Sequence, residues 1–219
     1  MSAPYHERQQ GTLCAVHAAN NLLQRAAFSQ DDFVRLQKLV PAEAPPLCAG
    51  CLRCCPRCCC RRCRTGEGNF DANVLMMALG EKRIALQYWD ARNADIDALI
   101  GMLGAEECVG ALLHTTAANH DCLVAAVIRC LARCFGENGH WISLLRIGGT
   151  DNNSIHDKDA VVGGDGDDHF LMDLDSKLAA PKLYTKQRAR ALLAQHLKVN
   201  TTILIANRMD AKQQNTGAG

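Results

Sequence analysis

The spacing of hydrophobic residues changes along the chain, and that change predicts its elements. Helical spacing predicts helices directly after Gly11, from about residue 29 to 40, and over 69–80, 95–103 and 185–197. Alternating or continuous apolar runs predict strands over 84–89, 109–113, 141–147, 170–174 and 201–206. The order of helices first and then mostly strands indicates an α+β fold with a helical half and a β half.

Side chains that cap helices support two of these helices. Ser29 is followed three residues later by Asp32, the pattern of a capping box, and Pro41 ends the helix that begins there. Thr185 can cap the helix that runs through Leu197. The residues after Asn207 are typical of a disordered tail.

Length and composition predict a single domain that does not bind nucleic acid. A chain of 219 residues with 48% hydrophobic and 21% charged residues can bury a sizeable core. A formal net charge of +1 gives no sign of the excess positive charge that proteins use to bind a phosphate backbone. We also find neither a secretory signal nor a run of about 20 apolar residues that could span a bilayer, so we expect the cytosol or the nucleus.

Eight of the thirteen cysteines lie between Cys48 and Cys63. Without a signal peptide, reduced thiols or metal ligation are favoured over disulfides. Pairs at C-x-x-C spacing make a zinc site one hypothesis, with these candidate ligands: Cys48, Cys51, Cys60 and Cys63. The registers overlap, however, so an arginine-rich insertion of biased composition is the favoured interpretation.

A polar segment lies between the strands predicted over 141–147 and 170–174. It runs from Gly148 to His169 and is rich in glycine and aspartate, too long for a tight hairpin. Its residues 165–168 hint at calcium, but they lack the spacing of an EF-hand. A solvated loop is the favoured interpretation of this segment.

Cys14 is a candidate nucleophile because a polar segment leads into it and a predicted helix follows. At the first turn of a helix, unpaired N–H groups and the positive end of the macrodipole favour a thiolate over a thiol. The alternative is that Cys14 is a buried small hydrophobe, as most free cysteines are. A base supplied from far along the chain would favour the first interpretation.

His140 is the candidate base, since it opens a strand directly after a glycine-containing loop. It follows Cys14 by 126 residues, close to the roughly 130–150 residues between cysteine and histidine in papain-like enzymes. His17 lies one turn from Cys14 and competes for the role, but helix geometry tilts its side chain towards the N-terminus and away. The other histidines show no comparable setting: His6, His114, His120, His156, His169 and His196.

Two further groups are needed, an acid that orients the base and a donor for the oxyanion. Asp173 and Asp175 share one face of a strand end, so the pattern cannot choose between them. We expect the carboxylate to hold Nδ1–H of the imidazole and to leave Nε2 facing the sulfur. Gln9, five residues before Cys14, could donate to the oxyanion together with the backbone N–H of Cys14.

Four blocks of sequence together resemble one known family. Residues 5–24, which contain the segment Leu13-Cys14-Ala15-Val16-His17, resemble the opening of Josephin-domain deubiquitinases. Residues 68–74 are similar to a second block of the small single-domain Josephins. Residues 139–142 and 173–178 resemble the blocks that carry the family's histidine and acid.

This resemblance implies a papain-like fold, in which the helical half with the nucleophile packs on an antiparallel sheet. It implies hydrolysis, by a thiol and without a cofactor, of the isopeptide or peptide bond after the C-terminal glycine of ubiquitin. Cys14 would be the nucleophile, His140 the base and acid, Asp175 the orienting residue and Gln9 the oxyanion donor. The partners would be ubiquitin or polyubiquitin conjugates, and we expect a monomer.

The chain departs from a small Josephin in three segments. Residues 1–207 would form the catalytic domain, with insertions at about 44–66, 115–136 and 149–169, before a disordered tail over 208–219. Because the second insertion comes just before His140, it could displace the base. Alternatives are therefore a ubiquitin-binding protein with impaired catalysis, a zinc-binding regulatory protein that uses the cysteine-rich tract, and a thiol hydrolase for another substrate.

Overall fold

The structure is a computed structural model, and it describes residues 3–40, 70–90, 95–115, 139–147, 169–199 and 201–209. Within these ranges the helices are α1 (Cys14–Leu22), α2 (Gln30–Gln37), α4 (Ala72–Glu81), α5 (Ile96–Gly104) and α7 (Lys186–Lys198). The strands are β1 (Ile84–Trp89), β2 (Cys108–Thr115), β3 (His140–Arg146), β4 (His169–Asp173), β5 (Lys182–Thr185) and β6 (Thr202–Arg208). The predicted α+β class is confirmed.

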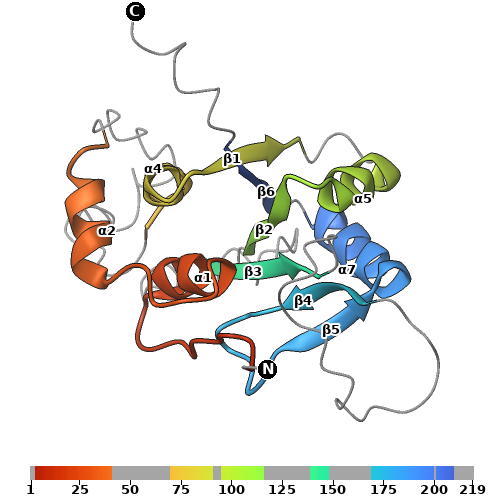
Figure 1. The fold of residues 1–219 in the computed structure, drawn as a ribbon, viewed down its shortest axis with the longest axis horizontal. Coiled ribbons are helices and arrows are strands. Elements are labelled where there is room, and N and C mark those ends of the chain that lie inside the picture. The colour runs from red at the N-terminus through yellow and green to blue at the C-terminus, as the bar shows by residue number, and fades with distance from the viewer. Residues whose placement is uncertain are drawn as a thin grey trace, which may run out of the picture.

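The six strands form one sheet in the order β1-β6-β2-β3-β4-β5 (Figure 1). Every neighbouring pair is antiparallel. The strand β6, the last in the described residues, therefore lies between β1 and β2, and β3 and β4 are neighbours. This order places the first residue of β3 and the turn after β4 in the same part of the molecule.

Helices cover both faces of the sheet, and two hydrophobic cores result (Figure 1). Alternate residues of β6 point to opposite faces. Leu204 and Ala206 pack in the core that contains α1, α2 and α4, whereas Ile203 and Ile205 pack in the core that contains α5 and α7. Burial on both faces explains why β6 reads as a continuous apolar run.

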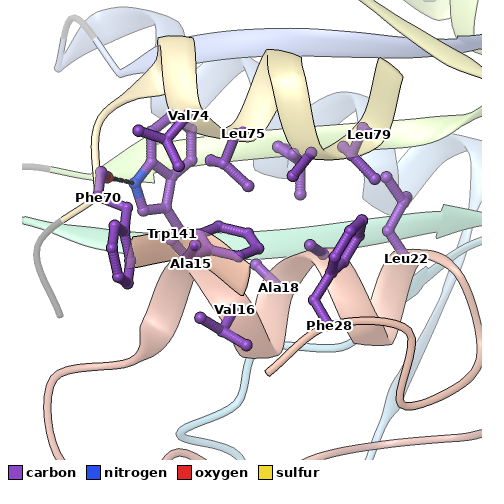
Figure 2. Close-up of a cluster of buried hydrophobic side chains, with 14 of the residues drawn as sticks. Ala15, Val16, Ala18, Leu22, Phe28, Phe70, Val74, Leu75, Leu79 and Trp141 are labelled. Carbon is purple, nitrogen blue, oxygen red and sulfur yellow. Dashed lines mark hydrogen bonds between the residues drawn. The ribbon is translucent and has the colours of Figure 1, made fainter. Parts of the chain in front are cut away.

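The first core fixes the helix that carries Cys14 against β3 (Figure 2). Small residues of α1 such as Ala15 and Ala18 are fully buried or nearly so, which lets the helix approach the sheet closely. Trp141, the second residue of β3, fills the space between α1 and α4, and its indole N–H donates to the carbonyl of Phe70 at 3.1 Å. The start of β3 is thereby held beside α1.

The predicted helix caps are confirmed. Ser29 and Asp32 form a reciprocal capping box at the start of α2. Thr185 accepts a hydrogen bond from the backbone N–H of Arg188 at the start of α7. The helix that was predicted over 69–80 begins at Ala72 and is capped by Asp71.

The structure differs from the prediction at several strand ends. The strand β5 was not predicted, because its four residues lie at the sheet edge and show no alternation of burial. Arg208 belongs to β6 and not to a tail, and the next residue, Met209, donates its N–H to the carbonyl of Arg83. Thr115 and His169, which were assigned to insertions, are strand residues paired within the sheet.

Several predictions fall on residues outside the described ranges. These are the cysteine-rich tract with the zinc candidates, residues 116–138, the calcium hint at residues 165–168, and the tail from residue 210. Within the described ranges, no helix is both long and apolar enough to cross a bilayer.

Candidate active site

Cys14 is the first residue of α1, as predicted, and only 5% of it is exposed. The preceding residue, Leu13, provides no side-chain cap, so N–H groups of the first turn remain for other acceptors. Burial raises the pKa of the Cys14 thiol, but the imidazole of His140 and the backbone N–H groups of Trp141 and Ala15 lower it by more. The net effect favours the thiolate.

The structure brings His140 and Asp175 into direct contact. The imidazole Nε2 of His140 lies 2.6 Å from Oδ1 of Asp175. His140 is 7% exposed, so the contact is largely shielded from water. The same carboxylate oxygen accepts the backbone N–H of Lys177 at 2.9 Å, which fixes its direction.

The nitrogen that meets the carboxylate is the opposite of the one predicted. The β3–β4 register pairs Leu144 with Asp173, and Leu174 donates its N–H to the carbonyl of Ser143. Asp175 follows directly after this pairing and meets Nε2, the nitrogen farther from the backbone. Nδ1 is buried, and it makes no aligned hydrogen bond within the described ranges. Nδ1 is therefore the nitrogen that remains for Cys14, and the Cys14 thiol lies close enough to His140 for the imidazole to lower its pKa.

The pKa values of the pair move in opposite directions. Burial lowers the pKa of His140, but the hydrogen bond of its ring to Asp175, the interaction with Cys14 and the charge of Asp175 raise it by more. Burial raises the pKa of Asp175, but its hydrogen bonds to His140 and Lys177 lower it by more. Both shifts favour an imidazolium beside a carboxylate, the state that stabilises a neighbouring thiolate.

Asp173 contacts the backbone of Asp175 and not the imidazole. Its Oδ1 accepts the N–H of Asp175 at 2.9 Å, so it shapes the turn that presents the second carboxylate. Burial raises the pKa of Asp173. The choice that strand periodicity left open is resolved by geometry, because it is Asp175 that touches His140.

Gln9 lies on the segment before α1 and is attached to the same turn as Asp175. Its backbone N–H donates to the carbonyl of Ser176 at 2.8 Å. Its side-chain Nε2 donates to the carbonyl of Gly11 at 2.9 Å, and its Oε1 is buried without a partner among the described residues. One N–H of this amide is thus engaged by its own loop, and the second is available to a ligand.

Gly139 leaves room for a neighbouring ring directly before His140. Its φ is +111°, and a Cβ there would lie 2.4 Å from Nε2 of His114. The ring of His114 packs on Trp141 with centroids 4.6 Å apart. Sequence reasoning gave His114 no setting of note, because only the pairing of β2 with β3 brings it here.

Known proteins provide an independent comparison. The family model for Josephin matches residues 9–207. The chain is similar to Josephin-2 of Homo sapiens, at 30% identity over 191 residues that cover 87% of this chain and 78% of that protein. It is similar to Josephin-2 of Mus musculus at 30% identity over 178 residues, covering 81% and 71%. The chain belongs to the Josephin family.

Membership confirms the papain-like α+β fold, and Josephin proteins are generally deubiquitinases with the chemistry of cysteine proteases. The family thus suggests a function of the deubiquitinase type and an interaction with ubiquitin. No group of three or more side chains within the described ranges could hold a metal ion. The described cysteines, Cys14 and Cys108, are both free thiols.

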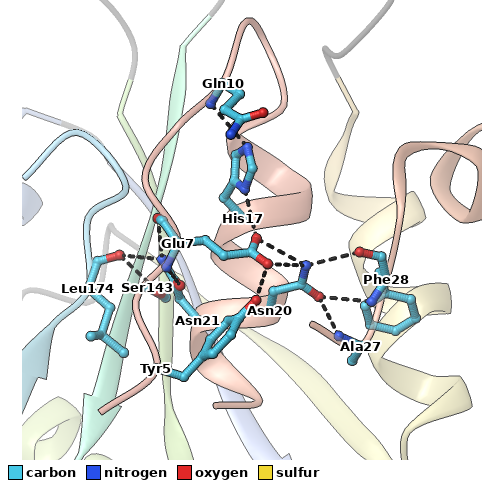
Figure 3. Close-up of polar contacts among 10 residues, drawn as sticks. All are labelled: Tyr5, Glu7, Gln10, His17, Asn20, Asn21, Ala27, Phe28, Ser143 and Leu174. Atoms are coloured by element: carbon cyan, nitrogen blue, oxygen red, sulfur yellow. Dashed lines mark hydrogen bonds and ion pairs between the residues drawn. The ribbon is translucent and has the colours of Figure 1, made fainter. Parts of the chain in front are cut away.

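Sequence reasoning missed a polar network that attaches the segment before Cys14 to α1 (Figure 3). The network contains Glu7, His17, Asn20 and Asn21, and the two asparagines are almost fully buried. The available signal was two adjacent asparagines inside a predicted helix. Asparagine has a low helix propensity, so two in succession indicate buried polar contacts.

Proposed function

We propose that this Josephin protein is a thiol-dependent deubiquitinase that hydrolyses the isopeptide or peptide bond after the C-terminal glycine of ubiquitin. The observation that carries the proposal is the contact between His140 Nε2 and Asp175, beside a cysteine whose pKa is lowered at the start of a helix. Family membership supplies the substrate class.

In the first half of the reaction, the thiolate of Cys14 attacks the carbonyl carbon of the terminal glycine. The oxyanion that forms accepts hydrogen bonds from the Gln9 side chain and the backbone N–H of Cys14. The imidazolium of His140 then gives its proton from Nδ1 to the departing amine as the C–N bond breaks. The product of this half is a thioester between ubiquitin and Cys14.

In the second half, neutral His140 accepts a proton from water, and the resulting hydroxide attacks the thioester carbonyl. The C–S bond breaks, and ubiquitin leaves with a free carboxylate. Asp175 keeps the ring oriented through Nε2 in both halves and stabilises the positive charge. Two protonation states of one imidazole therefore serve both steps.

Turnover of a ubiquitin C-terminal amide of a fluorescent amine tests this proposal. Cys14→Ala should lower kcat at least about a thousandfold, because it removes the nucleophile. Cys108→Ala is the matched control and should stay within about threefold of wild type, since Cys108 is buried in the second core and its pKa is raised to about 11. Folded wild-type protein that binds ubiquitin but never turns it over would instead support a binding function.

A further inference from the structure

The carboxylate of Glu7 accepts hydrogen bonds from three side chains beside α1 (Figure 3). The donors are the hydroxyl of Tyr5, Nδ1 of His17 at 2.8 Å and the amide of Asn20 at 3.1 Å. Burial raises the pKa of Glu7, but these hydrogen bonds lower it by more, so the group is ionised at neutral pH. An ionised carboxylate only accepts hydrogen bonds, which means that Nδ1 of His17 carries a proton.

The other nitrogen of His17 reaches the loop before Cys14. The backbone N–H of Gln10 lies 3.2 Å from Nε2, and an N–H can only donate. His17 is therefore the neutral tautomer with its proton on Nδ1, donating to Glu7 and accepting from Gln10. Because both nitrogens are engaged, this imidazole is not available as a base for the thiol.

The residue next to Gln10 is Gln9, the proposed oxyanion donor. Asn21 accepts the N–H of Glu7 at 2.6 Å, and Ser176 accepts the N–H of Gln9 at 2.8 Å. Like the contact of Asn21, the hydrogen bond of Gln10 to His17 joins this segment to α1, here one turn beyond Cys14. The N–H of Leu13 also donates to the carbonyl of Gln10 at 3.4 Å, and together these contacts hold residues 9–10 beside the helix that carries the nucleophile.

We propose that His17 is a positioning residue that holds the oxyanion donor Gln9 in register with Cys14 through its paired contacts to Glu7 and Gln10. This inference rests on the proposed function. It assigns to His17 an effect on the transition state, where the oxyanion exists, and none on the reactivity of the thiol itself.

Three substitutions at this position separate the two contacts. His17→Gln keeps a donor for Glu7 and an acceptor for Gln10. His17→Asn places an amide where Nδ1 stands, so it keeps the contact with Glu7 but is too short to reach Gln10. His17→Ala removes both contacts.

With the fluorogenic ubiquitin amide, His17→Asn and His17→Ala should lower kcat about tenfold to a hundredfold, with KM within about twofold. His17→Gln should recover kcat to within about threefold of wild type. Alkylation of Cys14 by iodoacetamide forms no oxyanion, so its rate should stay within about twofold in all three variants. An unchanged kcat in His17→Asn, or a parallel loss of alkylation rate, would overturn the inference.

A double variant tests whether His17 acts through Gln9. Gln9→Ala alone should lower kcat by about a hundredfold, and adding His17→Asn should lower it by no more than about twofold further. If the loss of kcat in the double variant equalled the product of the losses in the two single variants, His17 would act on something other than the oxyanion donor, and the inference would be wrong.

Amide hydrogen exchange separates this inference from the proposed function. The N–H of Gln10 should exchange at least about tenfold faster in His17→Asn than in wild type and in His17→Gln. If wild type turned over no ubiquitin substrate, the proposed function would fail while this measurement still decided whether His17 holds the segment. Equal exchange in all forms would reject the positioning role.

Discussion

At the scale of single residues, the site depends on an imidazole whose two nitrogens have different partners. Nε2 of His140 meets Asp175, and the sulfur of Cys14 responds to the same ring. The pKa of the thiol is lowered and that of the imidazole is raised. These opposite shifts widen the range of pH over which a thiolate and an imidazolium exist together.

The dependence of kcat/KM on pH should follow from these directions. As the pH is raised, activity should first increase when Cys14 loses its proton, at a pH below the ordinary pKa of a thiol. Activity should then decrease when His140 loses its proton, at a pH above the ordinary pKa of histidine. Asp175→Ala removes the charge that raises the pKa of His140, so the alkaline limb should move to lower pH. Asp175→Asn should move it less, and an alkaline limb that Asp175→Ala leaves in place would contradict the assignment.

Asp173 should act through the turn that carries Asp175. Asp173→Ala removes the acceptor for the backbone N–H of Asp175, and we expect kcat to fall by about tenfold with little change in KM. Asp173→Asn keeps an acceptor oxygen and should stay within about threefold of wild type. Steady-state kinetics with the fluorogenic amide checks this, and equal losses in both variants would show that charge at this position matters more than the hydrogen bond.

Element boundaries made Cys14, His140 and the pair of aspartates candidates, but the pattern left the alternative interpretations open. Strand periodicity could not choose between Asp173 and Asp175, which share one face, and only the resemblance to Josephins favoured Asp175. The ring nitrogen was wrongly predicted for a different reason. Which nitrogen meets the carboxylate depends on the orientation of the imidazole in the folded protein, and no local sequence pattern reports that orientation.

At the scale of elements, helices and long strands were predictable because each shows its own period of apolar residues. The strands β2 and β6 read as continuous apolar runs, and the two cores on opposite faces explain why. The edge strand β5 gave no signal, because four partly exposed residues need not alternate. Pairing in the sheet also extended β2 to Thr115 and β6 to Arg208 beyond their apolar segments.

Two glycines with different surroundings test the packing of these elements. A Cβ at Gly110 in β2 would lie 2.0 Å from the carbonyl oxygen of Leu144, so Gly110→Ala should lower the free energy of unfolding by at least about 2 kcal/mol. Among the described residues, no atom beyond its own helix backbone and chain neighbours lies within 4 Å of such a Cβ at Gly101 in α5, and Gly101→Ala should raise stability by about 0.5–1 kcal/mol. Urea denaturation measures both changes, and equal effects would contradict the described approach of β2 to β3.

At the scale of the whole molecule, the sheet joins parts of the chain that are far apart in sequence. The helix α1 and the segment before it come from the N-terminal end, His140 opens the central strand β3, and Asp175 follows β4 (Figure 1). Contacts of Asn21 with Leu174 and of Gln9 with Ser176 tie the first of these parts to the last. The site is therefore a product of the complete antiparallel sheet and cannot be ascribed to one local motif.

Covalent trapping with ubiquitin that carries a C-terminal electrophile tests the central claim most directly. The account predicts that wild type and Cys108→Ala each form one adduct, mapped by peptide mass spectrometry to Cys14, and that Cys14→Ala forms none. An adduct at any other cysteine, or no adduct on folded wild-type protein, would contradict it.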